Sequence, residues 1–409
     1  MMNIAYFSPI PFDFLMQRPQ YLAMELSKQH NVTFIEPTIS SLRFALKGGD
    51  SPLSKRRQIS ENLNIVRLNG LLTLPRTLNT FDFGLSLLWE LAQLRKMLHL
   101  TDVAWVGYPG WWPLVSRLGC NRLVYDRMDD CSLMVRNAAL SKQLSKNDKA
   151  LMQRANCVFA SAGNLYDEAL TINKQSYLLP NAVTADFAQK VFDFIPTAEK
   201  ICFEGARLAS PAVYEACTTG MASQAPTENV SAHEYGLVGK KVFGYVGMID
   251  SWFDFDAVAA IAEADSSHEI LLVGPSNIPK QQHNQIKYLG RVPKAELPAL
   301  ISGFDVCLYP FKQNKLLETI NPVKIYEYLA LNKPVLAVDS RETRTFGDMV
   351  NRYDSLVQLA MLSKQYLTPP FDTDEARYEF VAGNNWSKRG DVILAVLDDI
   401  FVKSGEIDG

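Results

Sequence analysis

The sequence predicts an α/β protein with two separate, doubly wound parallel sheets. Two observations support this prediction. Short apolar segments alternate with segments of helical period along both halves of the chain, as the strands and crossover helices of parallel sheets do. The chain also has 409 residues, which is too many for a single core of ordinary size. Two Rossmann-like domains satisfy both observations.

The first half of the chain contains enough strand-like segments for one sheet. NIAYFSP is short and continuously apolar, as a buried parallel strand is, and RPQYLAMELSKQ follows it with helical spacing. A second helix is expected at LSLLWELAQLRKML. Further strands are expected at VTFIEP, LNIVRLNG, VAWVGYP, RLVYDRMD, NCVFASA and YLLPNAV.

The second half repeats the alternation. Strands are expected at KVFGYVGM, HEILLVGP, IKYLGRV, VCLYPFK and PVLAVD. Helices are expected at DFDAVAAIAEA, AELPALISG and the segment that begins at Asn321. Sheets of this class bind ligands outside the carboxyl ends of their strands, so the loops after each strand are where functional residues are expected.

The segment between the two halves has no clear period. TTGMASQAPTENVS is small, polar and rich in turn residues, which indicates a linker or insertion. The predicted division is therefore a first domain over 1–187, an irregular linker over 188–240 and a second domain over 241–385. The amphipathic segment 386–409 is expected to form a last helix that crosses back to the first domain.

Composition narrows the class of protein. A hydrophobic content of 47% with 21% charged residues is typical of a globular protein and argues against disorder. No apolar run reaches membrane-spanning length, the first residues do not resemble a signal peptide, and six scattered cysteines fit a reducing cytoplasm. Residues 1–180 carry 20 basic and 14 acidic residues against 21 and 30 in the rest, so net charges of +6 and −9 predict different partners.

The segment NPVKIYEYLALNKPVLAVD carries the strongest functional pattern. Asn321 suits an N-cap and Pro322 the first turn of a helix, whose free N–H groups favour phosphate. Lys324 adds a positive charge there, and Glu327 lies one turn on, where a carboxylate can accept hydrogen bonds from both ribose hydroxyls. The alternative is an ordinary capped helix with a surface ion pair.

Glycine or polar residues also follow the neighbouring strands. Gly247 and Met248 end one strand, Gly274 ends the next, and Arg291 follows a glycine at the end of a third. Glycine at a strand end permits the close approach of backbone and ligand. Together with Lys315, these residues predict one crevice for a phosphorylated ligand.

The order GYVG, LLVGP, YLGRVPKAELPALISGFDVCLYPF and NPVKIYEYLALNKPV resembles the donor-binding domain of GT-B glycosyltransferases that build bacterial surface polysaccharides, over about residues 241–340. The resemblance implies the GT-B fold, in which two Rossmann-like domains face a cleft. It implies that Lys324 contacts the diphosphate, that Glu327 contacts the ribose, and that Gly247 and Met248 lie along the nucleotide sugar. Eight residues separate Glu318 from Glu327, where retaining members often have seven, so Glu318 is not assigned a role.

The loop after the first strand resembles the first acceptor loop of the same transferases. In PIPFDFLMQRPQYLA, Arg18 begins a helix, and the resemblance implies that Asp13 and Arg18 face the cleft. The alternative for Arg18 is a structural salt bridge at the start of the helix.

Three carboxylates follow the strand RLVYD, namely those of Asp126, Asp129 and Asp130. Crowded carboxylates raise one another's pKa values, which suits a general base. Similarity to inverting GT-B enzymes, such as the xanthan glucuronosyltransferase, implies that Asp129 is this base. Asp13 is the second choice for the base, and Asp126 is a candidate acceptor contact. The alternative is that the aspartates cap the next helix or bind Arg127 or Arg136.

Aromatic residues in YPGWWP suggest a sugar-binding surface. The faces of Trp111 and Trp112, with Tyr108, can stack on sugar C–H groups or lie at a membrane interface. The alternative is that they fill the core. The basic loop SKRRQ over 54–58 is a second candidate contact for lipid head groups.

Other chemistries lack their motifs. The sequence has no HExxH, no GxxxxGK[ST], no GxSxG and no basic-aromatic cluster, which argues against zinc hydrolysis, P-loop phosphoryl transfer, α/β-hydrolase chemistry and nucleic-acid binding. The DxD at 254–256 lies in an expected helix. No metal and no cofactor other than the nucleotide-sugar co-substrate are expected.

The predicted function is therefore transfer of a sugar from a nucleotide diphosphate, UDP being commonest in the family, to a hydroxyl of a glycan or lipid-linked acceptor. The predicted location is the cytoplasm, with peripheral contact at the inner membrane left open. Two alternatives remain. One is a nucleotide-sugar epimerase of the same fold, which needs no acceptor, and the other is a non-catalytic nucleotide-binding subunit of a polysaccharide assembly complex.

Overall fold

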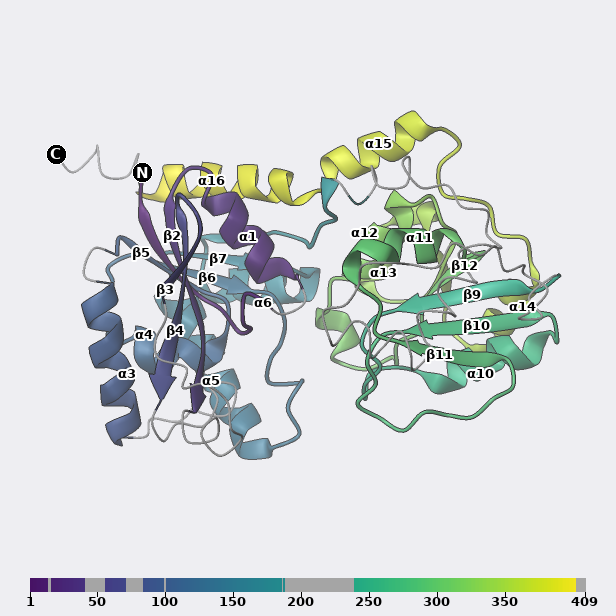
Figure 1. Cartoon of the computed structure of the whole chain (residues 1–409), viewed down its shortest axis with the longest axis horizontal. Helices are drawn as coiled ribbons and strands as arrows, with labels where there is room; N and C mark the ends of the chain where they lie inside the picture. The colour runs from purple at the N-terminus through teal and green to yellow at the C-terminus, as the bar shows by residue number, and fades with distance from the viewer. Residues whose placement is uncertain are drawn as a thin grey trace, which may run out of the picture. The chain divides into compact units, whose positions relative to one another are not determined.

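A computed structural model describes residues 1–13, 16–40, 56–70, 84–98, 101–185, 187 and 239–401 (Figure 1). The chain forms two compact units. Unit 1 comprises Met1–Asn181, Glu318–Asn321 and Trp386–Gly409, and unit 2 comprises Ala182–Leu317 and Pro322–Asn385. The first crossing between units thus falls at Asn181, six residues before the boundary that the sequence predicts. The predicted linker 188–240 lies outside the described residues apart from its last two positions.

Unit 1 contains an eight-stranded sheet in the order β3-β4-β2-β1-β5-β6-β7-β8. Every pairing is parallel except that of β3 with β4. Since β2 and β5 lie on opposite sides of β1, the strand order reverses between β1 and β5. The strands are β1 (Asn3–Phe7), β2 (Asn31–Ser40), β3 (Arg56–Ser60), β4 (Leu63–Gly70), β5 (Val103–Val106), β6 (Leu123–Arg127), β7 (Cys157–Ala160) and β8 (Ser176–Leu178).

Helices cover both faces of this sheet (Figure 1). On one face, α3, α4 and α5 contribute buried leucines to a core with β1, β5 and β6. On the other face α1 packs against the last helix, α16, with the rings of Tyr21 and Trp386 stacked 5.0 Å apart. The helices are α1 (Arg18–Leu26), α3 (Gly84–Met97), the 3₁₀ turn η1 (Pro109–Trp111), α4 (Trp112–Val115), α5 (Ala138–Arg154), α6 (Gly163–Ile172) and α16 (Trp386–Phe401).

The basic segment predicted as a loop is in part a strand. Arg56, Arg57 and Gln58 belong to β3, whose side chains are all exposed. A short, charged edge strand of this kind discourages pairing with another chain. The lipid-contact prediction for SKRRQ therefore rests on a surface strand instead of a loop.

Unit 2 contains a six-stranded, wholly parallel sheet in the order β11-β10-β9-β12-β13-β14. Its order reverses between β9 and β12, which defines the switch point of this unit. The strands are β9 (Lys241–Val246), β10 (His268–Val273), β11 (Ile286–Gly290), β12 (Val306–Tyr309), β13 (Val335–Val338) and β14 (Asn351–Tyr353).

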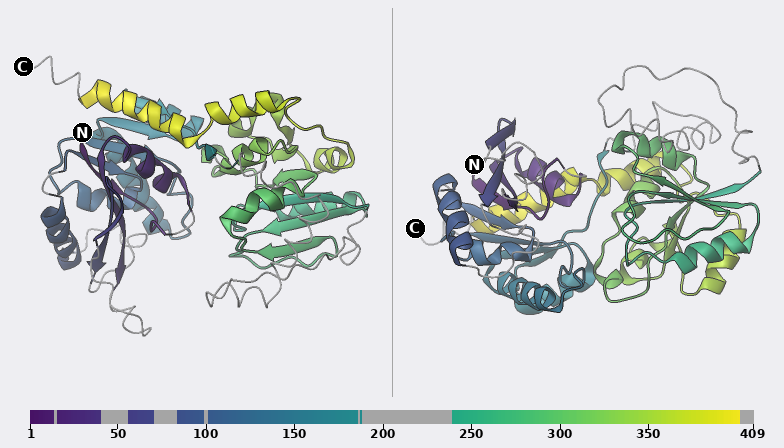
Figure 2. Two further views of the ribbon diagram at one scale, coloured as in Figure 1. Left: turned by 45° about the horizontal axis from the view of Figure 1, so that its top comes forward. Right: turned by 60° about the horizontal axis from the view of Figure 1, so that its bottom comes forward.

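Helices lie on both faces of the second sheet as well, with α10 and α14 on one and α11 and α12 on the other (Figure 2). Asp254 caps α10 by accepting hydrogen bonds from the N–H groups of Asp256 and Ala257, so the DxD segment forms a helix start. The helices are α10 (Phe255–Ala264), η3 (Lys294–Glu296), α11 (Leu297–Ser302), η4 (Leu317–Thr319), α12 (Val323–Ala330), α13 (Arg341–Arg344), η5 (Gly347–Met349), α14 (Leu356–Lys364) and α15 (Asp374–Gly383). The predicted α/β class with two doubly wound sheets is confirmed.

The loops after β9 and β10 run against each other without room for a side chain. A Cβ on Gly274 would lie 1.9 Å from the carbonyl oxygen of Gly247, and Gly274 has a φ of +135°. Only glycine tolerates both conditions.

Replacing this glycine tests how strongly the fold depends on the contact. We expect Gly274→Ala to lower the free energy of unfolding by more than about 2 kcal/mol, because strain and a backbone clash add together. Urea unfolding would measure the change. Gly383→Ala is the matched control: a Cβ there meets nothing within 4 Å, and we expect a change of less than about 1 kcal/mol. Equal effects of the two variants would contradict the close approach.

Candidate functional site

Unit 2 places the predicted donor residues at the carboxyl edge of its sheet. Past the end of β9, Gly247 N–H donates to the Val273 carbonyl (2.8 Å), and Ile249 N–H donates to the Pro275 carbonyl (2.9 Å). Asn277 N–H then donates to Ile249 (2.9 Å), and its amide donates to the Asp250 carboxylate (2.8 Å). The loop that carries Gly247 and Met248 is therefore held in one conformation by its neighbour.

Helix α12 brings the two charged residues of the opening pattern together. Lys324 Nζ donates to Glu327 Oε2 at 2.5 Å, with Glu327 only 6% exposed and Lys324 partly exposed. The pairing is the i,i+3 contact that the sequence predicts. The two residues lie about one helix turn apart. A phosphate bound there would meet the positive charge of Lys324, and ribose hydroxyls could donate hydrogen bonds to the carboxylate of Glu327.

The predicted helix cap is wrong by one residue. Pro322 is the N-cap of α12, and the helix begins at Val323. Asn321 instead joins unit 1, where its side-chain oxygen accepts from Asn181 N–H and its carbonyl accepts from the Asn181 side chain, both at 2.9 Å. A side chain engaged with another segment is unavailable to cap the helix.

The remaining donor residues lie on loops that leave the same edge of the sheet. Met248 is half-buried, and its carbonyl accepts a hydrogen bond from the Tyr245 hydroxyl (2.9 Å). Arg291 follows β11 directly and Lys315 follows β12, and both side chains are exposed. Neither has a hydrogen-bond or ion-pair partner within the described ranges, so both charges are available to an anion.

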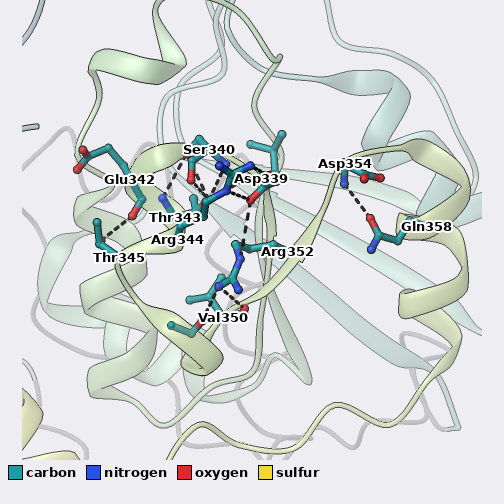
Figure 3. Close-up of polar contacts among 12 residues, drawn as sticks. Asp339, Ser340, Glu342, Thr343, Arg344, Thr345, Val350, Arg352, Asp354 and Gln358 are labelled. Carbon is teal, nitrogen blue, oxygen red and sulfur yellow. Dashed lines mark hydrogen bonds and ion pairs between the residues drawn. The ribbon is translucent and has the colours of Figure 1, made fainter. Parts of the chain in front are cut away.

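The polar side chains at the end of β13 form contacts with one another (Figure 3). Asp339 binds Arg344, by an Nε–Oδ1 hydrogen bond of 2.9 Å and a second ion-pair contact, and Arg352 Nε lies 3.8 Å from Asp339 Oδ1. These contacts with Arg344 lower the pKa of Asp339. Ser340 and Thr343 form a capping box at the start of α13. The cluster fixes the turn after β13 and leaves its carboxylate engaged.

Unit 1 has a buried ion pair beneath its carboxyl edge. The Arg18 guanidinium donates to Asp126 through Nε (3.0 Å) and Nη2 (2.7 Å), with exposures of 4% for Arg18 and 0% for Asp126. Its Nη1 donates to the Leu179 carbonyl (2.7 Å). The expectation that Arg18 and Asp126 contact an acceptor is therefore corrected: both are enclosed and bind each other, as the structural alternative for Arg18 predicts.

Asp129 lies just beyond this pair. Its side chain is half-buried, and no hydrogen-bond or ion-pair partner of its carboxylate is present among the described residues. Burial raises its pKa to about 7, against the lowering effect of Arg18 and with further raising by the carboxylates of Asp126 and Asp130. An unpaired carboxyl that titrates near neutral pH suits a general base.

The loop around Asp129 is fixed by a neighbouring strand. The Ser161 hydroxyl after β7 donates to the Met128 carbonyl (2.6 Å), and Ser161 N–H donates to the Arg127 carbonyl (3.1 Å). Arg127 itself pairs with Asp148 (2.9 Å) and Glu168 (2.6 Å). The loop that carries Asp129 is thus held in place, while its neighbour Arg127 pairs with other carboxylates.

Other aspartates near this edge have different surroundings. Asp130 accepts from the Ser132 N–H (3.0 Å) and hydroxyl (2.6 Å), while Asn137 caps α5. Asp13, the second candidate base, is 60% exposed and pairs with Arg57 at 2.6 Å. Its carboxylate is therefore already bound to a cation, whereas that of Asp129 is not.

The aromatic acceptor surface is mostly interior. Trp111 is fully buried, its Nε1 donates to the Ser8 carbonyl (2.8 Å), and its ring meets Phe7 edge-on at 5.4 Å. Tyr108 is 7% exposed, and Trp112 is partly buried against the same core. Trp111 and Tyr108 are therefore core residues, which corrects the sugar-stacking prediction for them and leaves Trp112 alone partly accessible.

Sequence reasoning missed two tyrosines that shape the unit 2 site. Tyr328 Oη accepts a hydrogen bond from Val246 N–H (3.0 Å), and Tyr245 bonds to Met248. The available signal in the sequence was a tyrosine within an apolar segment, on a helix for Tyr328 and on a strand for Tyr245. A buried tyrosine hydroxyl usually has a hydrogen-bond partner.

Within the described ranges, no group of three or more His, Cys, Asp or Glu residues is placed to hold a metal ion. None of the helices in the described part of the chain is both long and apolar enough to cross a membrane.

Known proteins resemble this chain in fold and, more distantly, in sequence. No family model matches it. A Bacillus subtilis (strain 168) protein named "Putative teichuronic acid biosynthesis glycosyltransferase TuaH" is 22% identical over 256 residues, covering 58% of this chain and 56% of that protein. The match thus spans little more than half of the relative.

Solved structures match nearly the whole chain. Sucrose-phosphate synthase from Thermosynechococcus elongatus has a TM-score of 0.65 at 14% identity, covering 98% of this chain and all of that one. Trehalose 6-phosphate synthase from Burkholderia multivorans has 0.64 at 12% identity, with 98% and 99% covered. HepE (Alr3699) from Anabaena, solved with UDP and glucose, has 0.61 at 13% identity, with 98% and 100% covered. The predicted GT-B fold and the resemblance to GT-B glycosyltransferases are confirmed.

The buried pair of unit 1 predicts a large loss of stability when it is broken. We expect Asp126→Asn to lower the free energy of unfolding by about 3–5 kcal/mol, because the Arg18 charge stays buried without a full counter-charge. Asp13→Asn breaks an exposed pair and should cost less than about 1 kcal/mol. Urea unfolding of both variants compares them directly, and similar losses would show that burial of the Arg18–Asp126 pair has no energetic consequence.

Asp129 predicts a pH-dependent stability. Its folded pKa of about 7 lies above its ordinary value, so the folded state keeps a proton that the unfolded chain releases, and stability falls as pH rises from about 4 to 7. Asp129→Asn removes this loss. We expect the variant to exceed the wild type by about 1–3 kcal/mol at pH 8, a figure discounted for partial exposure, and to match it near pH 4. Thermal unfolding across this range measures the difference; parallel curves would refute the raised pKa.

Proposed function

We propose that this chain is a glycosyltransferase that moves a sugar from a nucleoside-diphosphate donor to the hydroxyl of an acceptor. The observation that carries the proposal is the Lys324–Glu327 pair on α12, next to the glycine loop at the switch point of unit 2. Ligands of open α/β sheets bind at such points. A cation for phosphate and a buried carboxylate for ribose, one helix turn apart, match a nucleotide diphosphate.

The donor is held, in this proposal, by backbone and charge together. When the donor binds, Lys324 leaves its ion pair with Glu327 and binds the diphosphate instead. Glu327 then accepts hydrogen bonds from the ribose hydroxyls. Arg291 and Lys315 supply two more exposed cations from the same sheet edge. Because the leaving nucleotide gains negative charge as its bond to the sugar breaks, these cations lower the barrier to transfer. UDP is the proposed nucleotide, since the Anabaena relative is solved with UDP and with UDP-glucose.

Asp129 is the proposed general base. Its carboxylate takes the proton of the acceptor hydroxyl as the hydroxyl oxygen bonds to the anomeric carbon and the nucleoside diphosphate departs. One displacement of this kind inverts the anomeric centre. The residues proposed to bind the diphosphate are cationic side chains, so the proposal includes no metal.

The proposed acceptor is a glycan or a lipid-linked sugar used in cell-surface polysaccharide synthesis. The name of the Bacillus relative supports the polysaccharide class. Leu88 and Trp89 on α3 are 61% and 54% exposed, and Arg95 and Lys96 are exposed at the end of that helix. Apolar and basic side chains on one helix suit peripheral contact with an anionic membrane surface.

Nucleotide binding tests the donor site without knowledge of the acceptor. We expect calorimetric titration with UDP, GDP, dTDP and CMP to show binding of one diphosphate, and Glu327→Ala to weaken it at least about tenfold because the ribose contacts are lost. Glu375→Ala changes an exposed carboxylate on α15 and should bind as the wild type does. If folded wild-type protein binds none of the four nucleotides, the proposed donor site is wrong.

Turnover then separates the three candidate functions. A transferase with Asp129 as base gives an inverted product only with an acceptor, and its rate rises through an apparent pKa near 7. Asp129→Asn should then bind nucleotide normally yet transfer at least about a hundredfold more slowly. Conversion of the nucleotide sugar without an acceptor would indicate an epimerase, and binding without any turnover a non-catalytic subunit.

A further inference from the structure

Strands β9 and β12 separate before β9 ends. They pair only at Phe243 with Val306 and at Gly244 with Cys307, whereas β9 and β10 stay paired as far as Val246 with Val273. Gly247 N–H bonds to β10, and consecutive N–H groups of a strand point to opposite sides, so Val246 N–H points toward the β12 side. Because the pairing with β12 ends at Gly244, this buried amide has no strand partner on that side.

A tyrosine hydroxyl takes the place of the missing strand. Tyr328 is fully buried on α12, and its Oη accepts the hydrogen bond from Val246 N–H at 3.0 Å. Tyr328 follows Glu327 directly and lies four residues, about one helix turn, after Lys324. One side chain thus ties the helix with the charged pair to the last residue before Gly247.

A second hydroxyl holds the other end of the glycine loop. Tyr245 Oη donates to the Met248 carbonyl at 2.9 Å. A Cβ on Gly247 would lie 2.5 Å from that same oxygen, so the hydroxyl fills the space that a side chain would need. The backbone from Val246 to Met248 is therefore fixed from both sides by tyrosines, with glycine between them.

We propose that Tyr328 is a positioning residue of the donor site, whose hydroxyl sets the distance between the glycine loop of β9 and the charged face of α12. The inference rests on the proposed function, because it takes Gly247, Lys324 and Glu327 as donor contacts. A strand residue in the same place would satisfy Val246 N–H but would not tie β9 to α12. The Tyr328 hydroxyl satisfies this N–H and ties β9 to α12 at the same time.

Binding should depend on this hydrogen bond more than on packing. A nucleotide diphosphate would contact the loop of β9 and the side chains of α12 at once, so a shift between them weakens both sets of contacts. Tyr328→Phe keeps the ring and removes only the oxygen, which leaves Val246 N–H without its partner. The loss of stability alone does not identify a positioning role, so nucleotide affinity is the deciding measurement.

The test compares UDP and GDP binding by calorimetry in wild type, Tyr328→Phe and Tyr353→Phe, with thermal unfolding of each protein. Tyr353 is the matched control, since it is a buried tyrosine of the same unit whose hydroxyl has no hydrogen-bond partner in the described part of the chain. We expect Tyr328→Phe to raise the dissociation constant of the bound nucleotide about tenfold, at a temperature where the variant is fully folded. We expect Tyr353→Phe to bind the nucleotide as the wild type does.

The outcomes distinguish the inference from the proposed function. A folded Tyr328→Phe that binds with wild-type affinity overturns the positioning role and leaves the donor site intact, even if its melting temperature is lower. A wild type that binds neither nucleotide overturns both. If Tyr328→Phe does not fold, hydrogen exchange of the wild-type Val246 amide decides: slower exchange with bound nucleotide supports the role, and unchanged exchange overturns it.

Discussion

The separation of β9 from β12 is the constraint on which the unit 2 site depends. Ligands of open α/β sheets bind outside the carboxyl ends of the strands, at the point where the strand order reverses. Here the pairing of β9 with β12 stops at Gly244, which leaves the buried N–H of Val246 without a strand partner on that side. Val246 N–H bonds to Tyr328, and Gly247 N–H bonds to β10. One side-chain hydrogen bond therefore replaces the β12 ladder at Val246, while the β10 ladder continues to Gly247.

Unit 1 solves a related problem with charge. Arg18 from the start of α1, Asp126 from the end of β6 and the 179–181 segment are joined beneath the carboxyl edge by one guanidinium. Such a buried pair contributes little net stability, but removal of one partner is costly, so it defines one arrangement of three segments. Asp129, three residues beyond Asp126, is half-buried, and the loop that carries it is held by hydrogen bonds from Ser161. Its pKa is raised mainly by burial and further by the carboxylates of Asp126 and Asp130, whereas Arg18 lowers it.

The groups proposed for catalysis and for donor binding lie on different units. The carboxylate of Asp129, which has no cationic hydrogen-bond or ion-pair partner in the described ranges, lies on unit 1, and the cations of the proposed donor site lie on unit 2. Neither grouping follows from net charge alone. Each depends on local ion pairs. Arg127 pairs with Asp148 and Glu168, and Arg344 pairs with Asp339. Arg291 and Lys315, in contrast, are exposed. Which charges remain for a ligand is thus decided by the contacts each one makes within its own unit.

The sequence by itself determined the fold class, most of the segments that form strands and the helix that carries Lys324 and Glu327. These features depend on periodicity, helix-start residues and spacing of three or four positions, all of which are local. Only the tertiary structure decided which candidates are buried. Arg18, Asp126, Tyr108 and Trp111 have the residue types of a binding surface, yet they pack inside because distant segments supply their partners. Tyr328 was missed for the converse reason: its role depends on where two strands far apart in sequence stop pairing, which no local pattern records.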